Sequence, residues 1–345
     1  MTTAHRFTRR TITQTALGAV AITAIAPTRA IARQATPSAS PVSGRTVETT
    51  FGTVTVPAEI TSVVVIEGRR DLDIALALDL PVVGYPESAG VSASSPLLPA
   101  LESAIANGAE ALFVEDETDI EAILAVHPSL ILCRDEDLAE NDLYARLSAI
   151  APVLPVASTA TGVRWQDDFA FVADAVGATA RHDEVIAEFT ARFAEVQTTN
   201  VDVWSAKVVP LSYNENGMQF LSNRLLSQTL GDLGATFSSS AAPIFAEGGR
   251  ESYSLEQVQE AVGDADGVFI LVNEDSVFET WLNDPLWQTI PAIAAGHYVR
   301  SDKFTHDGGP ITALHCLDVI DALYATLREG ESSRSVADDN RAGVM

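Results

Sequence analysis

Short, wholly apolar runs alternate with segments of helical periodicity along most of the chain, and this alternation limits the possible folds. The runs SVVVIE (62–67), PVVGYP (81–86) and SLILC (129–133) show no polar/apolar alternation. Such runs are typical of strands that are covered on both faces, as in sheets flanked by helices. DLDIALALDL (71–80), between the first two runs, has apolar residues at helical spacing. The N-terminal half is therefore predicted to be α/β.

A long helical region then interrupts the strands. QDDFAFVADAVG (166–177) and DEVIAEFTARFAEV (183–196) each have one apolar face, and Gly177 ends the first helix. Strand signals resume with KVVPLSY (207–213) and GVFILV (267–272), and DPLWQTIPAIAAG (284–296) is expected to be a helix. The pattern predicts an α/β fold of two similar lobes, each with a central sheet flanked by helices, joined by a single long α-helix.

The segment boundaries follow from composition. RQATPSASPVSGR, near the N-terminus, and the last residues of the chain are polar or small and lack an apolar period. The predicted segments are an export signal (1–32), a flexible tether (33–45), an N-terminal α/β lobe (46–178), a connecting helix (179–199), a C-terminal α/β lobe (200–329) and a disordered tail (330–345).

The first 32 residues have the features of an export signal. They contain four arginines and no acid, followed by an apolar run, Ala16 to Ala26, that is too short to anchor the chain in a bilayer. The pair Arg9-Arg10 resembles a twin-arginine signal, and Ala30-Ile31-Ala32 fits a cleavage site. The expected location is the periplasm or the outer cell surface. A disordered basic N-terminus is the alternative, and a lipid anchor is not expected because no cysteine lies near the cleavage site.

The net charge of −26 limits the partners of the chain. Nucleic acid is excluded as a partner because its binding depends on Lys and Arg neutralising phosphates. Small anionic ligands stay possible, since salt screens a distant negative field and local arginines can outweigh it. Cys133 and Cys316 fall in different predicted lobes, so a buried thiol in each is expected rather than a disulfide.

The ordered series of segments resembles a known family. HPSLILCRDEDLAENDLYARLSAIAPVLPV in one half and NDPLWQTIPAIAAGHYVRSDKFTHDGGPITALHCLDVIDAL in the other are similar to the substrate-binding proteins of ABC importers for ferric siderophores, haem and cobalamin. The resemblance implies a monomer without catalytic activity, resident metal or cofactor. It would capture an Fe(III)-siderophore complex between its lobes and deliver it to an ABC permease. Trp287, Ile290 and Ile293 would be core residues, and the loop after them would reach the ligand.

The candidate ligand residues lie in loops after strands, where open α/β sheets bind ligands. Basic and polar side chains there suit an oxygen-rich ferric chelate, and aromatic ones suit its apolar parts. The candidates are Arg69, Arg70, Tyr85, Arg134, Tyr213, Arg250, Asn273, Trp281, Lys303 and His306. Two alternatives stay open: each arginine could instead pair with one of the many carboxylates, and Tyr85 and Trp281 could be core residues.

Two glutamates are candidates for docking on the permease. In the family that the chain resembles, one exposed glutamate per lobe meets arginines of the permease. The matching residues are Glu121 in DIEAIL and Glu256 in YSLEQV, with Asp119 and Ser254 as expected helix N-caps. The alternative is that these acids only complement the helix dipole.

Particular residues bear on other possible functions. Haem would favour an axial Tyr85, Tyr213 or His306, and cobalamin would favour aromatic walls with fewer arginines. Histidines near the C-terminus, such as His297 and His315, do not have the spacing of known metal motifs. A secreted metal-dependent hydrolase is a distant alternative, because the chain has no GxSxG motif.

Overall fold

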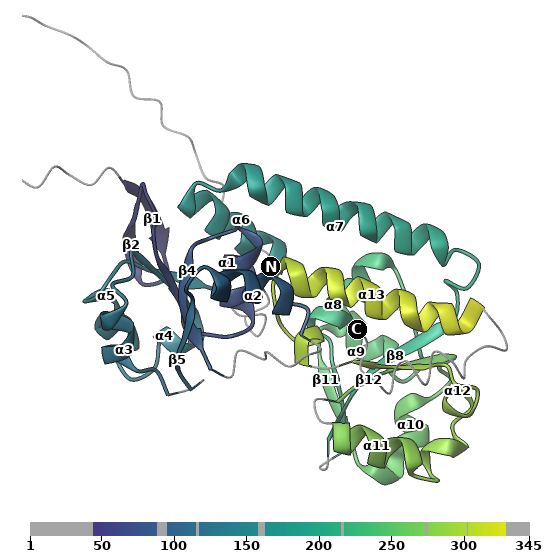
Figure 1. The fold of residues 1–345 in the computed structure, drawn as a ribbon. Coiled ribbons are helices and arrows are strands. Elements are labelled where there is room, and N and C mark those ends of the chain that lie inside the picture. Colours follow the sequence, from purple (N-terminus) through teal and green to yellow (C-terminus); the bar gives the residue numbers. More distant parts are fainter. Residues whose placement is uncertain are drawn as a thin grey trace, which may run out of the picture. The chain divides into compact units, whose positions relative to one another are not determined.

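Two β-sheets, each covered by helices, form the folded part of the chain (Figure 1). The computed structural model describes residues 44–87, 95–114, 117–157, 163–214, 217–272, 275–301 and 303–328. The predicted export signal and the predicted tail lie outside these residues. The described residues all belong to one compact unit. We call the first sheet with its helices the first lobe, and the second sheet with its helices the second lobe.

The first sheet has five parallel strands in the order β5-β4-β3-β6-β7. The strands are β3 (Val63–Val65), β4 (Val82–Pro86), β5 (Glu110–Phe113), β6 (Leu130–Arg134) and β7 (Val153–Val156). Every residue of β3 and β7 is buried, as expected for apolar runs without alternation. The strand order reverses direction between β3 and β6, so the loops after these two strands border a topological switch point.

Helices connect these strands. They are α1 (Arg70–Ala77), α2 (Leu98–Ala106), α3 (Ile120–Ala125), α4 (Asp135–Leu138), α5 (Leu143–Ser148) and α6 (Trp165–Val176). The lobe begins with an antiparallel hairpin of β1 (Gly44–Thr49) and β2 (Gly52–Pro57). β1 therefore starts inside the segment 33–45 that the sequence assigned to a tether.

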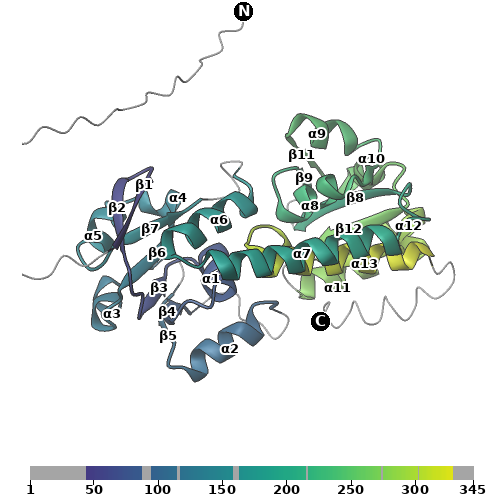
Figure 2. The ribbon, with the colours of Figure 1, turned by 90° about the horizontal axis from the view of Figure 1, so that it is seen from above.

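The last helix of the first lobe is followed by the long helix that leads to the second lobe. α6 ends at Gly177, whose φ of 77° is readily adopted by glycine. The next helix, α7 (Thr179–Thr199), occupies the segment predicted as the connecting helix. It packs along the C-terminal helix α13 (Pro310–Arg328), and the two lie side by side in Figures 1 and 2. One apolar cluster includes buried residues of β3, α1, α7 and α13, so the two lobes share a core.

The second sheet is mixed, in the order β11-β9-β8-β12-β13, with β10 paired to β8. The strands are β8 (Lys207–Asn214), β9 (Gly217–Leu221), β10 (Thr236–Phe237), β11 (Arg250–Tyr253), β12 (Gly267–Leu271) and β13 (Tyr298–Ser301). β10, β12 and β13 are parallel to β8, whereas β9 and β11 extend the sheet by antiparallel pairing. The second sheet therefore resembles the first only in its parallel part.

Short helices complete the second lobe. They are α8 (Leu225–Leu233), α9 (Ala242–Glu247), η2 (Leu255–Gln257), α10 (Val258–Val262), α11 (Asp275–Asn283), η3 (Trp287–Thr289), α12 (Pro291–Ala294) and η4 (Lys303–Thr305). The single helix expected over 284–296 was wrong. Pro291 has no N–H to donate and begins a new helix, so the segment divides into η3 and α12.

α13 is the one helix of the described residues that is long and apolar enough to cross a membrane. Most of it is buried, against α1, α7 and α8, as in the core helix of a folded unit. Cys133 and Cys316 are both buried and are not joined in a disulfide, which confirms the expectation of two buried thiols. Trp287, Ile290 and Ile293 are buried in the core of the second lobe, also as predicted.

Candidate functional site

The candidate site begins at the switch point of the first sheet. Residues after β3 and β6 meet there because both strands are parallel and adjacent. Glu67 accepts hydrogen bonds from the N–H groups of Arg69 (2.9 Å) and Arg70 (2.7 Å), and so fixes the turn into α1. Its other oxygen, Oε1, accepts from Nε of Arg69 at 2.9 Å. The Arg69 side chain is 28% exposed, so it is held in place while part of its surface stays open.

Arg70, the next residue, lies in the interior instead of at a surface. Its side chain is fully buried, with Nε 3.5 Å from Asp168 and Nη1 3.6 Å from Asp307. Burial raises the pKa of Asp168 to about 6, although the charge of Arg70 lowers it. The sequence placed Arg70 at the ligand, whereas the structure makes it the buried counter-ion of two carboxylates, one from each lobe.

A second-lobe arginine, Arg224, joins Arg69 and His306 in a basic cluster, which we call the basic triad. Arg224 precedes α8, and its backbone neighbour Leu225 donates a hydrogen bond to the carbonyl oxygen of His306 at 3.0 Å. Burial lowers the pKa of His306 to about 3, and the charges of Arg224 and Arg69 lower it further. Burial also lowers the pKa of Arg224, with Arg69 adding to this and Asp307 opposing it. Three basic groups from both lobes thus lie within electrostatic reach of one another.

Two nitrogens of the basic triad have donor or acceptor capacity to spare. Nε of Arg224 and Nε2 of His306 are buried and have no hydrogen-bond partner among the described residues. Buried polar atoms are normally hydrogen-bonded, and like charges held close together are costly. An anionic group of a ligand would satisfy the free nitrogens and offset the repulsion between Arg69 and Arg224.

Arg134, at the end of β6, is engaged within the first lobe. Its Nη2 donates to Asp137 at 2.8 Å. Burial alone would lower the pKa of Arg134, but Asp137, Glu67 and Asp71 together raise it. Asp71 is fully buried, and burial followed by the charge of Glu67 raises its pKa well above the usual value. Arg134 therefore balances a group of carboxylates, which was the alternative left open by the sequence.

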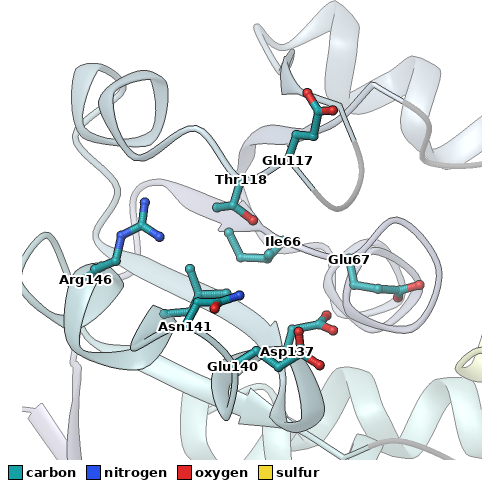
Figure 3. Close-up of a pocket in the computed structure, with 9 residues that line it drawn as sticks. Ile66, Glu67, Glu117, Thr118, Asp137, Glu140, Asn141 and Arg146 are labelled. Carbon is teal, nitrogen blue, oxygen red and sulfur yellow. The ribbon is translucent and has the colours of Figure 1, made fainter.

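A pocket of about 460 Å³ is lined in part by Glu67, the ion-pair partner of Arg69 (Figure 3). Carboxylates surround it, with one arginine on the opposite side: Glu67, Glu117, Asp137, Glu140 and Arg146. Because these carboxylates would repel an anion, the pocket suits the anionic part of a ligand less well than the basic triad does. The sequence did not single out Glu67, Glu117, Glu140 or Arg146, because acids are common throughout the chain.

The aromatic candidates lie mainly in the interior. Trp281 is fully buried in α11, with its ring 4.8 Å from that of Trp287 and 5.6 Å from that of Phe278. It belongs to the core of the second lobe, not to an exposed surface. Tyr85, at 8% exposure, packs in the core of the first lobe. Tyr213 is partly exposed and makes an edge contact with Trp287.

The remaining ligand candidates are on or beside the second sheet. Arg250 is exposed at the start of β11, opposite Leu221 of β9, which is three residues before Arg224. Lys303 begins η4, but its side chain lies outside what the structure describes. Asn273 lies outside the described residues altogether. The structure thus brings Arg69 and His306 together, adds Arg224, and leaves Arg250 on an exposed edge strand.

Arg224 was missed because the sequence suggested only a helix beginning at RLLSQTL. The strand β9 before it contains Met218, Gln219 and Phe220, and its pairing with β8 was not predicted. Recognising β9 would have identified Ser222 to Arg224 as another loop at a strand end.

Both docking candidates are exposed in first turns. Asp119 caps α3 and accepts from the N–H groups of Glu121 (2.9 Å) and Ala122 (3.1 Å). Ser254 is the N-cap residue of η2, where a hydrogen bond from its side chain lowers the pKa of Glu256. The two predicted N-caps are therefore confirmed, and whether the glutamates contact a permease stays a prediction.

Comparison with known proteins agrees with this architecture. Residues 74–303 match the model of the family described as "Periplasmic binding protein". The chain is 25% identical over 295 residues to a protein named "Probable siderophore-binding lipoprotein YfiY" from Bacillus subtilis, covering 81% of this chain and 87% of that protein.

Solved structures share the fold at low sequence identity. One is Staphylococcus aureus SirA complexed with staphyloferrin B (TM-score 0.64, 17% identity, covering 82% of this chain and 98% of SirA). Another is the siderophore periplasmic binding protein from the fuscachelin gene cluster of Thermobifida fusca (TM-score 0.61, 21% identity, covering 79% and 98%). These structures share the fold, and the family match over residues 74–303 shows that the chain belongs to the periplasmic binding protein family.

Proposed function

We propose that the protein is the extracytoplasmic solute-binding component of an ABC importer, and that it captures a ferric siderophore and delivers it to the membrane permease. Family membership supports the binding role, and the names of the similar proteins support an iron chelate as the ligand. The proposal involves no catalytic step and no resident cofactor.

The observation that carries the choice of ligand is the basic triad. Arg69 and Arg224 come from different lobes and lower the pKa of His306, so an anion bound there would gain charge-assisted hydrogen bonds from both lobes. Catecholate, hydroxamate and carboxylate oxygens around Fe(III) present such acceptors. The charged residues that line the first-lobe pocket are mainly carboxylates, which would repel an anion. The anionic part of the chelate is therefore expected at the basic triad.

A fluorescence titration tests this function. Trp281 and Trp287 lie in the second lobe, so iron-dependent quenching of tryptophan emission should report binding. Purified protein would be titrated with ferric catecholate, ferric hydroxamate and ferric citrate, with haemin and cobalamin as competitors and iron-free chelators as controls. Saturable quenching by at least one ferric chelate is expected. Binding of haemin or cobalamin alone would replace the siderophore proposal with one of the alternatives.

Delivery and export are further parts of the proposal. We propose that Glu121 and Glu256, exposed at helix starts, dock on the permease as the resemblance implies, and that the protein acts as a monomer. Export by the twin-arginine route is proposed from Arg9 and Arg10. Replacing both by lysine should block export of a folded reporter. Unchanged export of the reporter with the lysine variant would refute that route.

A further inference from the structure

The first turn of α13 receives its cap from the other lobe. An α-helix leaves its first N–H groups without a partner inside the helix, and a side-chain oxygen usually accepts from them. Here Asp73 of α1 accepts from the N–H groups of Gly309 (2.8 Å), Ile311 (2.9 Å) and Thr312 (3.0 Å), and from the hydroxyl of Thr312 (2.6 Å). Both carboxylate oxygens are used, across more than 230 residues of sequence.

This contact is buried and closely packed. Asp73 and Thr312 are both fully buried. A Cβ atom on Gly309 would lie 3.1 Å from Cγ of Asp73, which is closer than ordinary van der Waals contact. The approach of α1 to α13 is therefore fitted to a residue without a side chain, and a small shift of either helix would break several hydrogen bonds together.

The contact lies next to the basic triad in both lobes. Asp73 is one helical turn beyond Arg69, and Arg69 accepts at its carbonyl the N–H of Asp73 at 2.8 Å. Gly309 is three residues beyond His306. Asp307, which lies between these two residues in sequence, has Oδ1 3.6 Å from Nη1 of Arg70. The carbonyl oxygen of His306 accepts a hydrogen bond from the N–H group of Leu225. The loop that carries His306 is thus held by α1 at one end and by α8 on its side.

We infer that Asp73 is a positioning residue of the ligand site, which fixes the loop bearing His306 opposite Arg69 by capping α13 from the first lobe. The inference rests on the proposed function, and it adds how the two halves of the site are kept in register before the ligand arrives. Pre-organisation of this kind raises affinity because the ligand does not have to order the loop on binding.

The test compares Asp73→Asn with a matched control, Asp119→Asn. Asp119 also caps a helix with its carboxylate, but α3 and its cap belong to one lobe. In Asp73→Asn the side-chain NH2 group replaces a carboxylate oxygen that accepts from backbone N–H groups. The backbone amide hydrogens of Gly309 and Thr312 should therefore exchange with solvent much faster than in the wild type. Affinity for the ferric chelate should fall by about tenfold. The control should change neither quantity.

A double-mutant cycle separates positioning from general destabilisation. If Asp73 acts through the loop, Asp73→Asn should weaken binding strongly in the wild-type background and less than about twofold in the His306→Ala background. Equal losses in both backgrounds, or unchanged affinity with fast exchange at Gly309, would overturn the inference. If Asp73→Asn does not fold, Thr312→Val removes one of the four hydrogen bonds and should give a smaller loss of the same pattern.

Failure of the proposed function gives a different result. Wild-type protein that binds no ferric chelate would refute that function. Hydrogen exchange would still test the cap, because the backbone amides of Gly309, Ile311 and Thr312 should be protected in the wild type and lose this protection in Asp73→Asn. Slow exchange that persists in the variant would refute the cap itself.

Discussion

Acid should destabilise the protein through His306. In the unfolded chain a histidine has a pKa of about 6.5. In the folded protein, burial and then the charges of Arg224 and Arg69 lower the pKa of His306 to about 3. Between these values the unfolded chain binds a proton that the folded protein does not. The stability from His306 is therefore complete above pH 6.5 and is lost as the pH falls toward 3.

The size of the effect follows from the two pKa values. Proton linkage gives a loss of about 2 kcal/mol in the free energy of unfolding between pH 7 and pH 5. The figure changes little as long as the folded pKa stays below about 4, because His306 is then neutral in the folded protein at both pH values. Asp168 acts in the opposite direction, because burial raises its pKa to about 6. As the pH falls, the folded protein binds this proton before the unfolded chain does, and this stabilises the fold.

Comparison with His306→Gln isolates the histidine. Urea unfolding of the ligand-free protein and the variant would be measured at pH 7 and pH 5. The contribution of Asp168 is common to both and cancels in the difference. The wild type should lose about 2 kcal/mol more than the variant on acidification. Equal losses within about 0.5 kcal/mol would show that burial and the charges of Arg224 and Arg69 do not keep His306 neutral in the folded protein.

Three further predictions address binding, folding and delivery. Arg224→Gln should weaken binding of the ferric chelate by about tenfold or more, because it removes a cation that could form charge-assisted hydrogen bonds with the ligand. The control is Arg181→Gln, which should leave the affinity unchanged because Arg181 pairs with Asp79 and Glu184; equal affinities of the Arg224 variant and the wild type in calorimetry would argue against the basic triad. Trp281→Ala should lower the free energy of unfolding by about 3–5 kcal/mol, since the indole is fully buried; a loss below about 1 kcal/mol in urea unfolding would contradict its place in the core. Reversing the charge of both Glu121 and Glu256 should abolish iron uptake by cells while chelate affinity stays unchanged, and continued uptake would refute docking through these residues.

The adjacent residues Arg69 and Arg70 show which part of the site could not be predicted from the sequence. Arg69 and Arg70 are equivalent by sequence, since both follow the same strand. The structure leaves Arg69 partly exposed and buries Arg70 between Asp168 and Asp307. These carboxylates come from other helices and loops, so no local pattern could distinguish the two arginines. Trp281 is similar: its aromatic side chain suited a ligand contact or a core position equally well, and the packing of Phe278 and Trp287 against it is a tertiary contact.

The sequence by itself determined the elements whose burial is uniform along the chain. The apolar runs at β3, β6 and β12, the helices α6 and α7, and the two buried thiols follow from local periodicity and composition, because a strand covered on both faces or a helix with one apolar face leaves a repeating pattern. Only the tertiary structure decided which charged groups meet. Arg69, Arg224 and His306, and Asp73 with the first turn of α13, come together through the packing of α1, α8 and α13, and electrostatic contacts over such sequence separations leave no periodic signal.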